Sequence, residues 1–164
     1  MAMPRLRSGA VLVAAMLCTL ASAAASSGAR PIKAADMAQA KRIEVDYALH
    51  CQGCHLPDGS GSAGKVPDLR QSLAHFLRVP GGREFLVQVP GVATSRLDDA
   101  GTARLLNWMV ETMGGGLPCT VQPFTAEEVG NLRKAWLRKA GPVRARLMEQ
   151  VAKLPAAPRN TCRS

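Results

Sequence analysis

The chain has 164 residues, and 21 lysines and arginines stand against 12 aspartates and glutamates, which gives a formal charge of +9 at neutral pH. Its apolar fraction of 47% argues against an intrinsically disordered chain, because disorder requires low hydrophobicity together with high charge. Six aromatic residues are few for the core of a domain of this size. Either aliphatic side chains fill the core, or a group that is not protein occupies part of it.

The first 25 residues are predicted to form a secretory signal peptide. Arg5 and Arg7 supply a positively charged start, residues 10–20 form a short apolar run, and small residues up to Ala23 supply a cleavage site. The apolar run is about half the ~20 residues that cross a bilayer, so no stable membrane insertion is expected. Cleavage deletes two arginines and leaves a formal charge of +7. The mature protein is therefore expected in the periplasm, where no nucleic-acid partner is expected.

Helical signals follow a polar lead-in over residues 26–35. Asp36 is a candidate N-cap, and apolar residues at helical spacing predict a helix over residues 37–51. Residues 53–67 are rich in glycine and contain two prolines, which predicts an irregular loop. A short helix is then expected over residues 69–78.

Two more helical elements are predicted before a glycine-rich break. Residues 83–89 favour a short element. Residues 97–113 form an amphipathic helix pattern, with Asp98 and Asp99 at the positive end of the helix dipole. The stretch Gly114–Pro118 is expected to end this helix.

The C-terminal third continues the helical pattern. Thr125 and Glu128 form a capping box that predicts the start of another helix. Gly141 and Pro142 are expected to break that helix, and a basic amphipathic stretch continues to residue 154. The chain shows no internal repeat and no pair of strands, so the predicted fold class is all-α.

The motif that carries chemistry is C-x-x-C-H, formed by Cys51, Cys54 and His55. Two thiols on one helical turn can each add to one vinyl group of a haem, and the adjacent histidine then lies under the ring with its imidazole directed at the iron. A thioredoxin-like redox pair would need a βαβ context, which is not visible. A zinc site would need a second pair of ligands, and His50 and His75 do not supply it.

Around this motif the chain resembles the class I cytochromes c. Tyr47, four residues before the first motif cysteine, matches the aromatic residue that this family places against the haem. Pro67, twelve residues after His55, and Leu69 match the Pro-x-Leu sequence of the family. The resemblance implies helices packed around one covalent haem c, His55 as an iron ligand, and a Pro67 carbonyl that orients the His55 ring.

The resemblance divides the chain into four parts. Residues 1–25 are the signal peptide, 26–35 the lead-in and 36–113 the cytochrome c domain, and residues 114–164 are expected to form a C-terminal helical extension and tail.

The resemblance leaves the sixth iron ligand open. Most electron-carrying members supply a methionine from a loop shortly before a terminal helix. In the favoured register Val89 occupies that position, and valine cannot bind iron. If the terminal helix is instead the one that begins at Thr125, Met113 or Met109 falls where a ligand could lie, although both fit the apolar stripe of a helix. His75 is a further candidate, and a vacant position is the remaining alternative.

Two cysteines and a basic stretch remain outside the motif. Cys119 and Cys162 form an even pair in an exported chain, which suggests a disulfide. The C-terminal third is strongly basic, which favours either a solvated helix face or docking to an acidic redox partner. Its cations are Arg133, Lys134, Arg138, Lys139, Arg144, Arg146 and Lys153.

The leading functional hypothesis is an exported monohaem one-electron carrier, and not an enzyme, because the sequence shows no nucleophile–base pair and no carboxylate cluster. The first alternative is a five-coordinate haem protein that binds small ligands or has weak peroxidase activity, with His75 and Arg83 as candidate distal groups. The second alternative is the haem subunit of a larger dehydrogenase.

Overall fold

The computed structural model describes residues 34–114 and 121–155 and shows an all-α chain, as predicted. Within these residues the one β pairing is an isolated bridge between Ser62 and Val66. None of the helices described is long and apolar enough to cross a membrane. The helices are α1 (Ala34–His50), α2 (Leu69–Phe76), α3 (Gly82–Gln88), α4 (Pro90–Ala93), α5 (Asp99–Met113), α6 (Ala126–Leu132), the 3-10 helix η1 (Arg133–Ala135) and α7 (Ala140–Ala152).

Several predictions fall outside the described residues. The signal peptide, Cys119 and Cys162 all lie there, so cleavage near Ala23 and the disulfide remain predictions. The division of the chain at residue 114 also remains a prediction.

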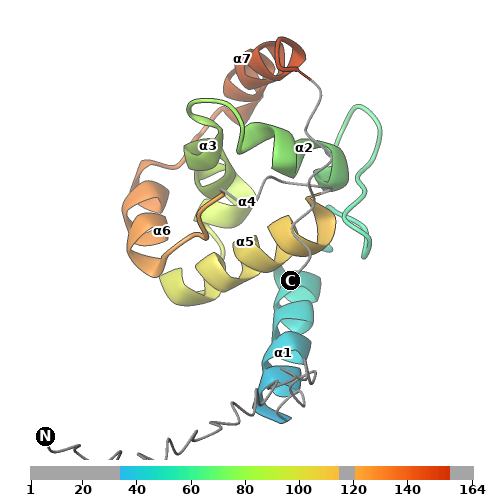
Figure 1. Ribbon diagram of the computed structural model, residues 1–164, viewed down its shortest axis with the longest axis vertical. Helices are drawn as coiled ribbons and strands as arrows, with labels where there is room; N and C mark the ends of the chain where they lie inside the picture. The colour runs from blue at the N-terminus through green and yellow to red at the C-terminus, as the bar shows by residue number, and fades with distance from the viewer. Residues whose placement is uncertain (1–33, 115–120, 156–164) are drawn as a thin grey trace, which may run out of the picture. The chain divides into compact units, whose positions relative to one another are not determined.

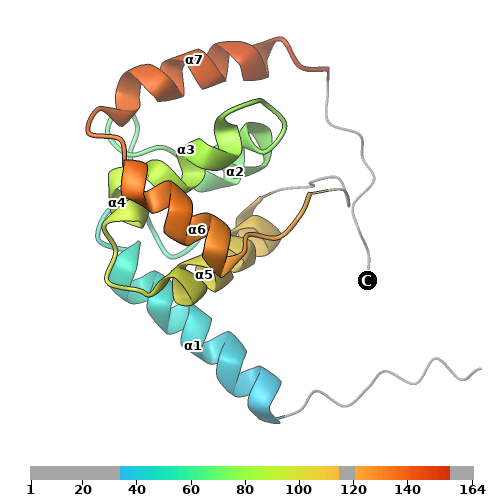
Figure 2. The same ribbon diagram turned by 90° about the vertical axis from the view of Figure 1, so that its left-hand side faces the viewer.

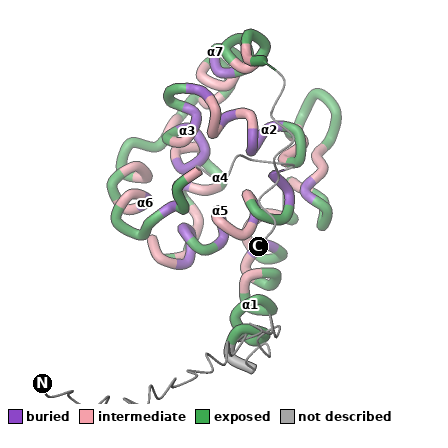
Figure 3. Tube along the Cα trace, in the orientation of Figure 1, coloured by how far each residue is buried: buried purple, intermediate pink, exposed green. Residues whose placement is uncertain are grey.

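The helix expected over residues 37–51 is present as α1, but its start was predicted wrongly. It begins at Ala34, so Asp36 lies in the first turn and is not the N-cap. A carboxylate in the first turn still interacts favourably with the positive end of the helix dipole. Most of α1 before Tyr47 is exposed to solvent, and Figures 1 and 3 show it extending away from the other helices.

Helices α2, α3 and α5 lie close to the predicted ranges, and aspartates cap two of them, whereas α4, which begins at Pro90, was not predicted. The Asp68 carboxylate accepts a hydrogen bond from the backbone N–H of Arg70 at the start of α2. The Asp98 carboxylate accepts one from the backbone N–H of Gly101 at the start of α5. Each cap satisfies a backbone donor that has no partner within its helix.

The helix predicted to begin at Thr125 does begin there, but it ends earlier than predicted. Thr125 caps α6 through its hydroxyl, as predicted. The helix does not reach Gly141 and Pro142, however, because it ends at Leu132 and the chain passes through η1 into an extended segment. Gly141 and Pro142 instead lie in the first turn of α7, where a proline removes no hydrogen bond of the helix.

The C-terminal helices pack onto the same core as the rest of the domain. Figures 1 and 2 show α2 and α3 between α7 on one side and α5 on the other, with α6 against α3 and α5. Val129 of α6 is fully buried, and Leu147 of α7 is buried in the same apolar cluster as Phe76 and Leu106. The predicted extension therefore contributes directly to the core.

Arg83 joins α3 to the segment that precedes α6. Its guanidinium pairs with the Glu128 carboxylate, with Nη2 2.7 Å from Oε2, and donates to the carbonyls of Gln122 and Pro123. The same group lies 4.0 Å from the ring centroid of Phe124. The Arg83 side chain is 26% exposed, so these contacts are partly shielded from water.

We expect Arg83→Met to lower the free energy of unfolding by about 2–3 kcal/mol, because it leaves a carboxylate and two carbonyls without a partner. The control is Arg70→Met, since Arg70 also forms ion pairs but its side chain is 46% exposed. An exposed pair contributes about 1 kcal/mol or less. Denaturant unfolding of the two variants measures the difference, and equal losses would contradict a stabilising role specific to Arg83.

Candidate functional site

The C-x-x-C-H motif forms a tight turn at the C-terminal end of α1. The backbone N–H of Cys51 donates to the Tyr47 carbonyl at 2.8 Å, and the N–H of His55 donates to the Cys51 carbonyl at 2.9 Å. The Cys54 N–H also donates to the Cys51 carbonyl, at 3.2 Å. The cysteines therefore lie one turn apart, with Cys51 half-buried and Cys54 exposed.

Tyr47 connects this turn to α5. Its side chain is 1% exposed, and its hydroxyl donates a hydrogen bond of 2.8 Å to the Leu56 carbonyl, just after the motif. Its ring lies 5.5 Å from the ring of Trp108, where α1 crosses α5. The sequence placed Trp108 on the apolar face of its helix, but helical spacing alone could not show which residue it contacts on another helix.

The structure places Pro67 beside His55, as the resemblance implied. Burial lowers the pKa of His55, while the Pro67 carbonyl and the charge of Asp68 oppose that effect. His55 Nδ1 is buried and makes no hydrogen bond of ordinary geometry, so the Pro67 carbonyl is near enough to act on the ring but not ideally aligned. A carbonyl at Nδ1 would leave Nε2 free for a metal.

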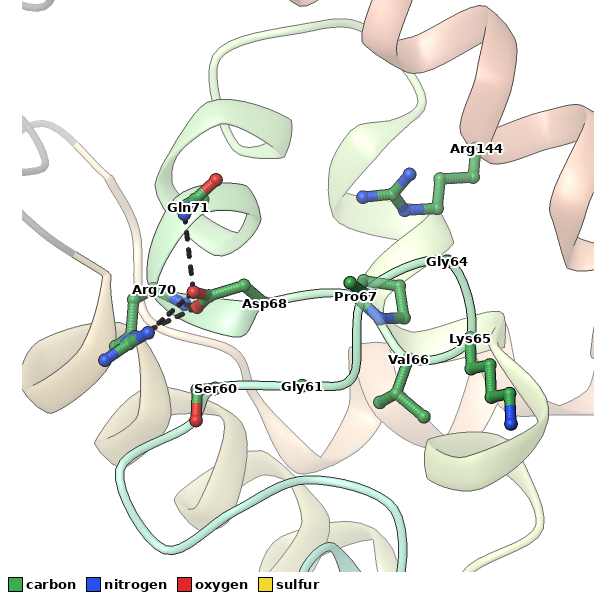
Figure 4. A pocket seen from close by; sticks show the side chains of 11 residues that line it. Ser60, Gly61, Gly64, Lys65, Val66, Pro67, Asp68, Arg70, Gln71 and Arg144 are labelled. Atoms are coloured by element: carbon green, nitrogen blue, oxygen red, sulfur yellow. Dashed lines mark hydrogen bonds and ion pairs between the residues drawn. The ribbon is translucent and has the colours of Figure 1, made fainter.

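An ion-pair network shapes the loop that carries Pro67. The Asp58 carboxylate accepts hydrogen bonds from the Ser60 backbone and hydroxyl, and one from Arg70 at 2.7 Å. Arg70 also pairs with Asp68, the residue after Pro67, as Figure 4 shows. Sequence reasoning missed this network, although the sequence Asp-Gly-Ser at residues 58–60 is a recognisable turn signal.

A surface cavity of about 650 Å³ lies on the far side of this loop. Figure 4 shows Ser60, Lys65, Pro67 and Arg144 among its lining residues. None of the motif side chains lines it. The cavity therefore reaches the candidate site only through Pro67, whose carbonyl acts on His55.

The two motif cysteines do not resemble a reactive redox pair. Burial, and to a smaller extent the neighbouring Cys54, raises the pKa of the Cys51 thiol to about 11. Catalytic redox cysteines have a lowered pKa instead, because the thiolate is the nucleophile. Across residues 34–114 and 121–155 no three histidine, cysteine or acidic side chains are grouped as a metal site. In this part of the chain the donor set suits covalent attachment of a haem better than zinc.

The residues present therefore fit haem c. Cys51 and Cys54 can form the two thioethers, and His55 follows them with its ring nitrogen Nδ1 turned to protein. Tyr47 and Pro67 support the motif from the helix side and the loop side respectively.

In the register that puts Val89 in the methionine position, residues 89–98 correspond to the methionine loop, and Arg133 contacts this stretch. Residues 89–98 contain no methionine, histidine, cysteine, lysine or tyrosine. The Arg133 guanidinium donates to the carbonyls of Ala93, Ser95 and Leu97 at 2.7–3.0 Å, and pairs with the Asp99 carboxylate at 3.0 Å. Its side chain is only 17% exposed. One buried guanidinium thus holds the connection between α4 and α5.

The structure places the other candidate iron ligands in packed surroundings. Met109 and Met113 are both buried on α5. The Met113 sulfur fills the space left by the missing Cβ of Gly59, a glycine with a φ of 81° in the loop that leads to Pro67. His75 lies on α2, and its Nδ1 is buried without a hydrogen-bond partner. Val89 lies between α3 and α4, packed against the core.

The chain is similar to two proteins from Thermus thermophilus, both described as cytochrome c-552. The first is 34% identical over 116 residues, which cover 59% of this chain and 77% of the relative. The second is 34% identical over 102 residues, covering 51% of this chain and 78% of the relative. No family model and no solved structure matches the chain.

The two alignments also show that this chain is shorter than its relatives in the matched region. The covered shares correspond to about 97 and about 84 of its 164 residues, so about 19 and about 18 aligned positions have no residue here.

The pKa of Tyr47 gives a direct test of whether the side chain that supports the motif is buried. Burial, followed by Cys51 and Asp58, raises the pKa of Tyr47 to about 12. Tyr47 is the only tyrosine in the sequence, so tyrosinate absorbance reports on it alone. We expect the folded protein to form tyrosinate only near pH 12, and the chain in denaturant to do so near the ordinary value of about 10.

The same shift predicts the direction of a stability change. Between about pH 10 and 12 the unfolded chain loses a proton that the folded protein keeps, so stability falls as the pH rises through this window. Tyrosinate formation in the folded protein near pH 10 would show that Tyr47 is not buried.

Proposed function

The chain belongs to the c-type cytochromes, which are electron carriers rather than enzymes, and on that premise we propose that it is an exported monohaem carrier of single electrons. The observation that carries the proposal is the arrangement at the end of α1. There the two cysteines occupy one turn, and the buried nitrogen of His55 lies near the Pro67 carbonyl.

Each residue has a defined part in holding the group. Cys51 and Cys54 would attach the ring, and the free ring nitrogen of His55 would bind the iron. Pro67 orients the imidazole and increases its basicity, because a carbonyl that accepts from Nδ1–H adds electron density to the ring. When bound, haem c supplies an iron centre that changes oxidation state by one electron. Tyr47 keeps the attachment turn fixed against α5.

The exported location and the type of partner follow from the sequence. The proposed signal peptide directs the chain to the periplasm, where covalent haem attachment takes place. The mature charge of +7 favours redox partners with an acidic docking surface, since long-range attraction raises the rate of transient encounters.

Haem attachment is tested by co-expression with a c-type maturation system. We expect the wild-type protein to be heavier by one haem under denaturing mass spectrometry, and the double variant Cys51→Ala, Cys54→Ala to carry no covalent haem. Each single variant should retain at most one thioether. A colourless wild-type protein of unmodified mass, produced beside a correctly matured control cytochrome, would refute the proposal.

A second candidate function is supported by the segment between α3 and α5. This segment offers no side chain of the usual ligand types, and Arg133 holds its C-terminal part closed. We therefore propose that the sixth iron position is vacant, which would let the protein bind small neutral ligands such as carbon monoxide.

The spectrum of the ferric protein distinguishes the two cases. A vacant position predicts a high-spin spectrum and rapid binding of carbon monoxide by the reduced protein. We expect Met109→Leu, Met113→Leu and His75→Ala to leave both properties unchanged. A low-spin spectrum that becomes high-spin in one of these variants would identify that residue as the ligand, and would leave the carrier function intact.

A further inference from the structure

We propose that the exposed segment between η1 and α7 is the docking surface for an acidic protein partner, with Trp136 as its anchor. The surface consists of Trp136, Arg138 and Lys139 in this segment together with Lys134 of η1, and we call it the Trp136 patch. This inference rests on the proposed carrier function, because it names the surface through which the carrier meets its partner.

Trp136 is a large aromatic side chain left accessible on a basic surface. It is 41% exposed, and the Arg138 guanidinium lies 5.7 Å from its ring centroid. Arg138 and Lys139 are exposed as well. Tryptophan and arginine are the residues that most often dominate binding energy at protein interfaces. An exposed tryptophan stacked by an arginine therefore suits recognition better than core packing.

Along the chain, the charged residues on both sides of Trp136 have one sign. Residues 129–148 contain six cations and no acidic residue. Arg133 is turned inward onto the α4–α5 connection, and Arg144 is half-buried above the Phe76 ring, whereas Arg146 is exposed on α7. Lys134, Arg138 and Lys139 remain exposed, and no ion pair involves them among the described residues. Their charge is available to an acidic partner.

The patch has a rigid support beneath it. The backbone N–H of Leu137, between Trp136 and Arg138, donates to the Gln88 carbonyl at the end of α3 at 2.9 Å. The Leu137 side chain is half-buried and packs against the core. η1 follows α6 and lies next to α4 (Figure 2). Four contacts of the Arg133 side chain fix it there. A preorganised surface loses little conformational entropy on binding.

An acidic protein fits this surface better than an anionic membrane does. Interfacial membrane binding usually needs a long helix with one continuous apolar face. The patch lies on an extended segment and offers a single large apolar side chain, and on the following helix α7 the one large hydrophobic residue that is exposed is Met148, at 37%. A transient protein encounter needs only a small contact area.

The experiment uses the haem-loaded protein on a gold electrode coated with a carboxylate-terminated monolayer, as a substitute for an acidic protein surface. Adsorbed mass and the voltammetric wave are recorded together at about 0.1 M salt. We expect Arg138→Glu, Lys139→Glu and, separately, Trp136→Ala to weaken adsorption at least about tenfold. The control Lys41→Glu, Arg42→Glu makes the same charge change on an exposed part of α1 that extends away from the patch, and should adsorb nearly as wild type.

The outcomes separate the docking surface from the carrier function. Equal adsorption of all variants, or an equal loss in the α1 control, would overturn the patch. Binding to phosphatidylglycerol vesicles at the same salt that depends on Trp136 would replace the protein partner by a membrane and also overturn it. A normal wave with adsorption independent of the patch leaves the carrier function standing, whereas adsorption through the patch without any wave refutes the carrier function alone.

Discussion

The contact of Tyr47 with α5 is the interaction on which the candidate site depends. One residue supplies the carbonyl that receives Cys51, the hydroxyl that binds the Leu56 carbonyl, and the ring that lies against Trp108. Both ends of the C-x-x-C-H turn are therefore fixed relative to α5 by a side chain that solvent does not reach. Because the hydroxyl is bonded while the ring packs, burial of this polar group carries no penalty for an unmade hydrogen bond.

Two arginines, one on each side of the contact, join the C-terminal third to the rest of the domain. Arg83 of α3 reaches the segment before α6, and Arg133 of η1 reaches back to the loop before α5. Each guanidinium satisfies several carbonyls of a connection that has no regular structure. The rigid fork of donors on arginine suits this use, whereas a lysine could not satisfy the same set.

The sequence predicted the helices and their caps well, since these depend on neighbours along the chain. The caps at Asp98 and Thr125 could be identified because the signal and its partner lie within three residues. The resemblance to class I cytochromes c pointed to Tyr47 and Pro67 as partners of the motif, and the structure places both near it.

The predictions that failed depend on contacts made across the fold. Helical spacing continues past Leu132, but the helix ends because Arg133 binds the loop before α5 and Leu137 binds the end of α3. Neither contact leaves a signal in the local sequence. Gly141 and Pro142 were interpreted as a break, although the first turn of a helix accepts both residue types.

The basic run that the sequence presented as one feature has two physical roles. A cation that is shielded from solvent needs hydrogen-bond acceptors. The Arg133 guanidinium has four of them, three carbonyls and one carboxylate, in and beside the connection before α5. Cations that stay exposed keep their charge for a partner, as Lys134, Arg138 and Lys139 do around Trp136. Because η1 contains Arg133 and the segment after it contains Trp136, Arg138 and Lys139, the contacts with the loop before α5 and the proposed docking surface are structurally linked. Loss of the Arg133 contacts would therefore affect both the connection before α5 and the Trp136 patch.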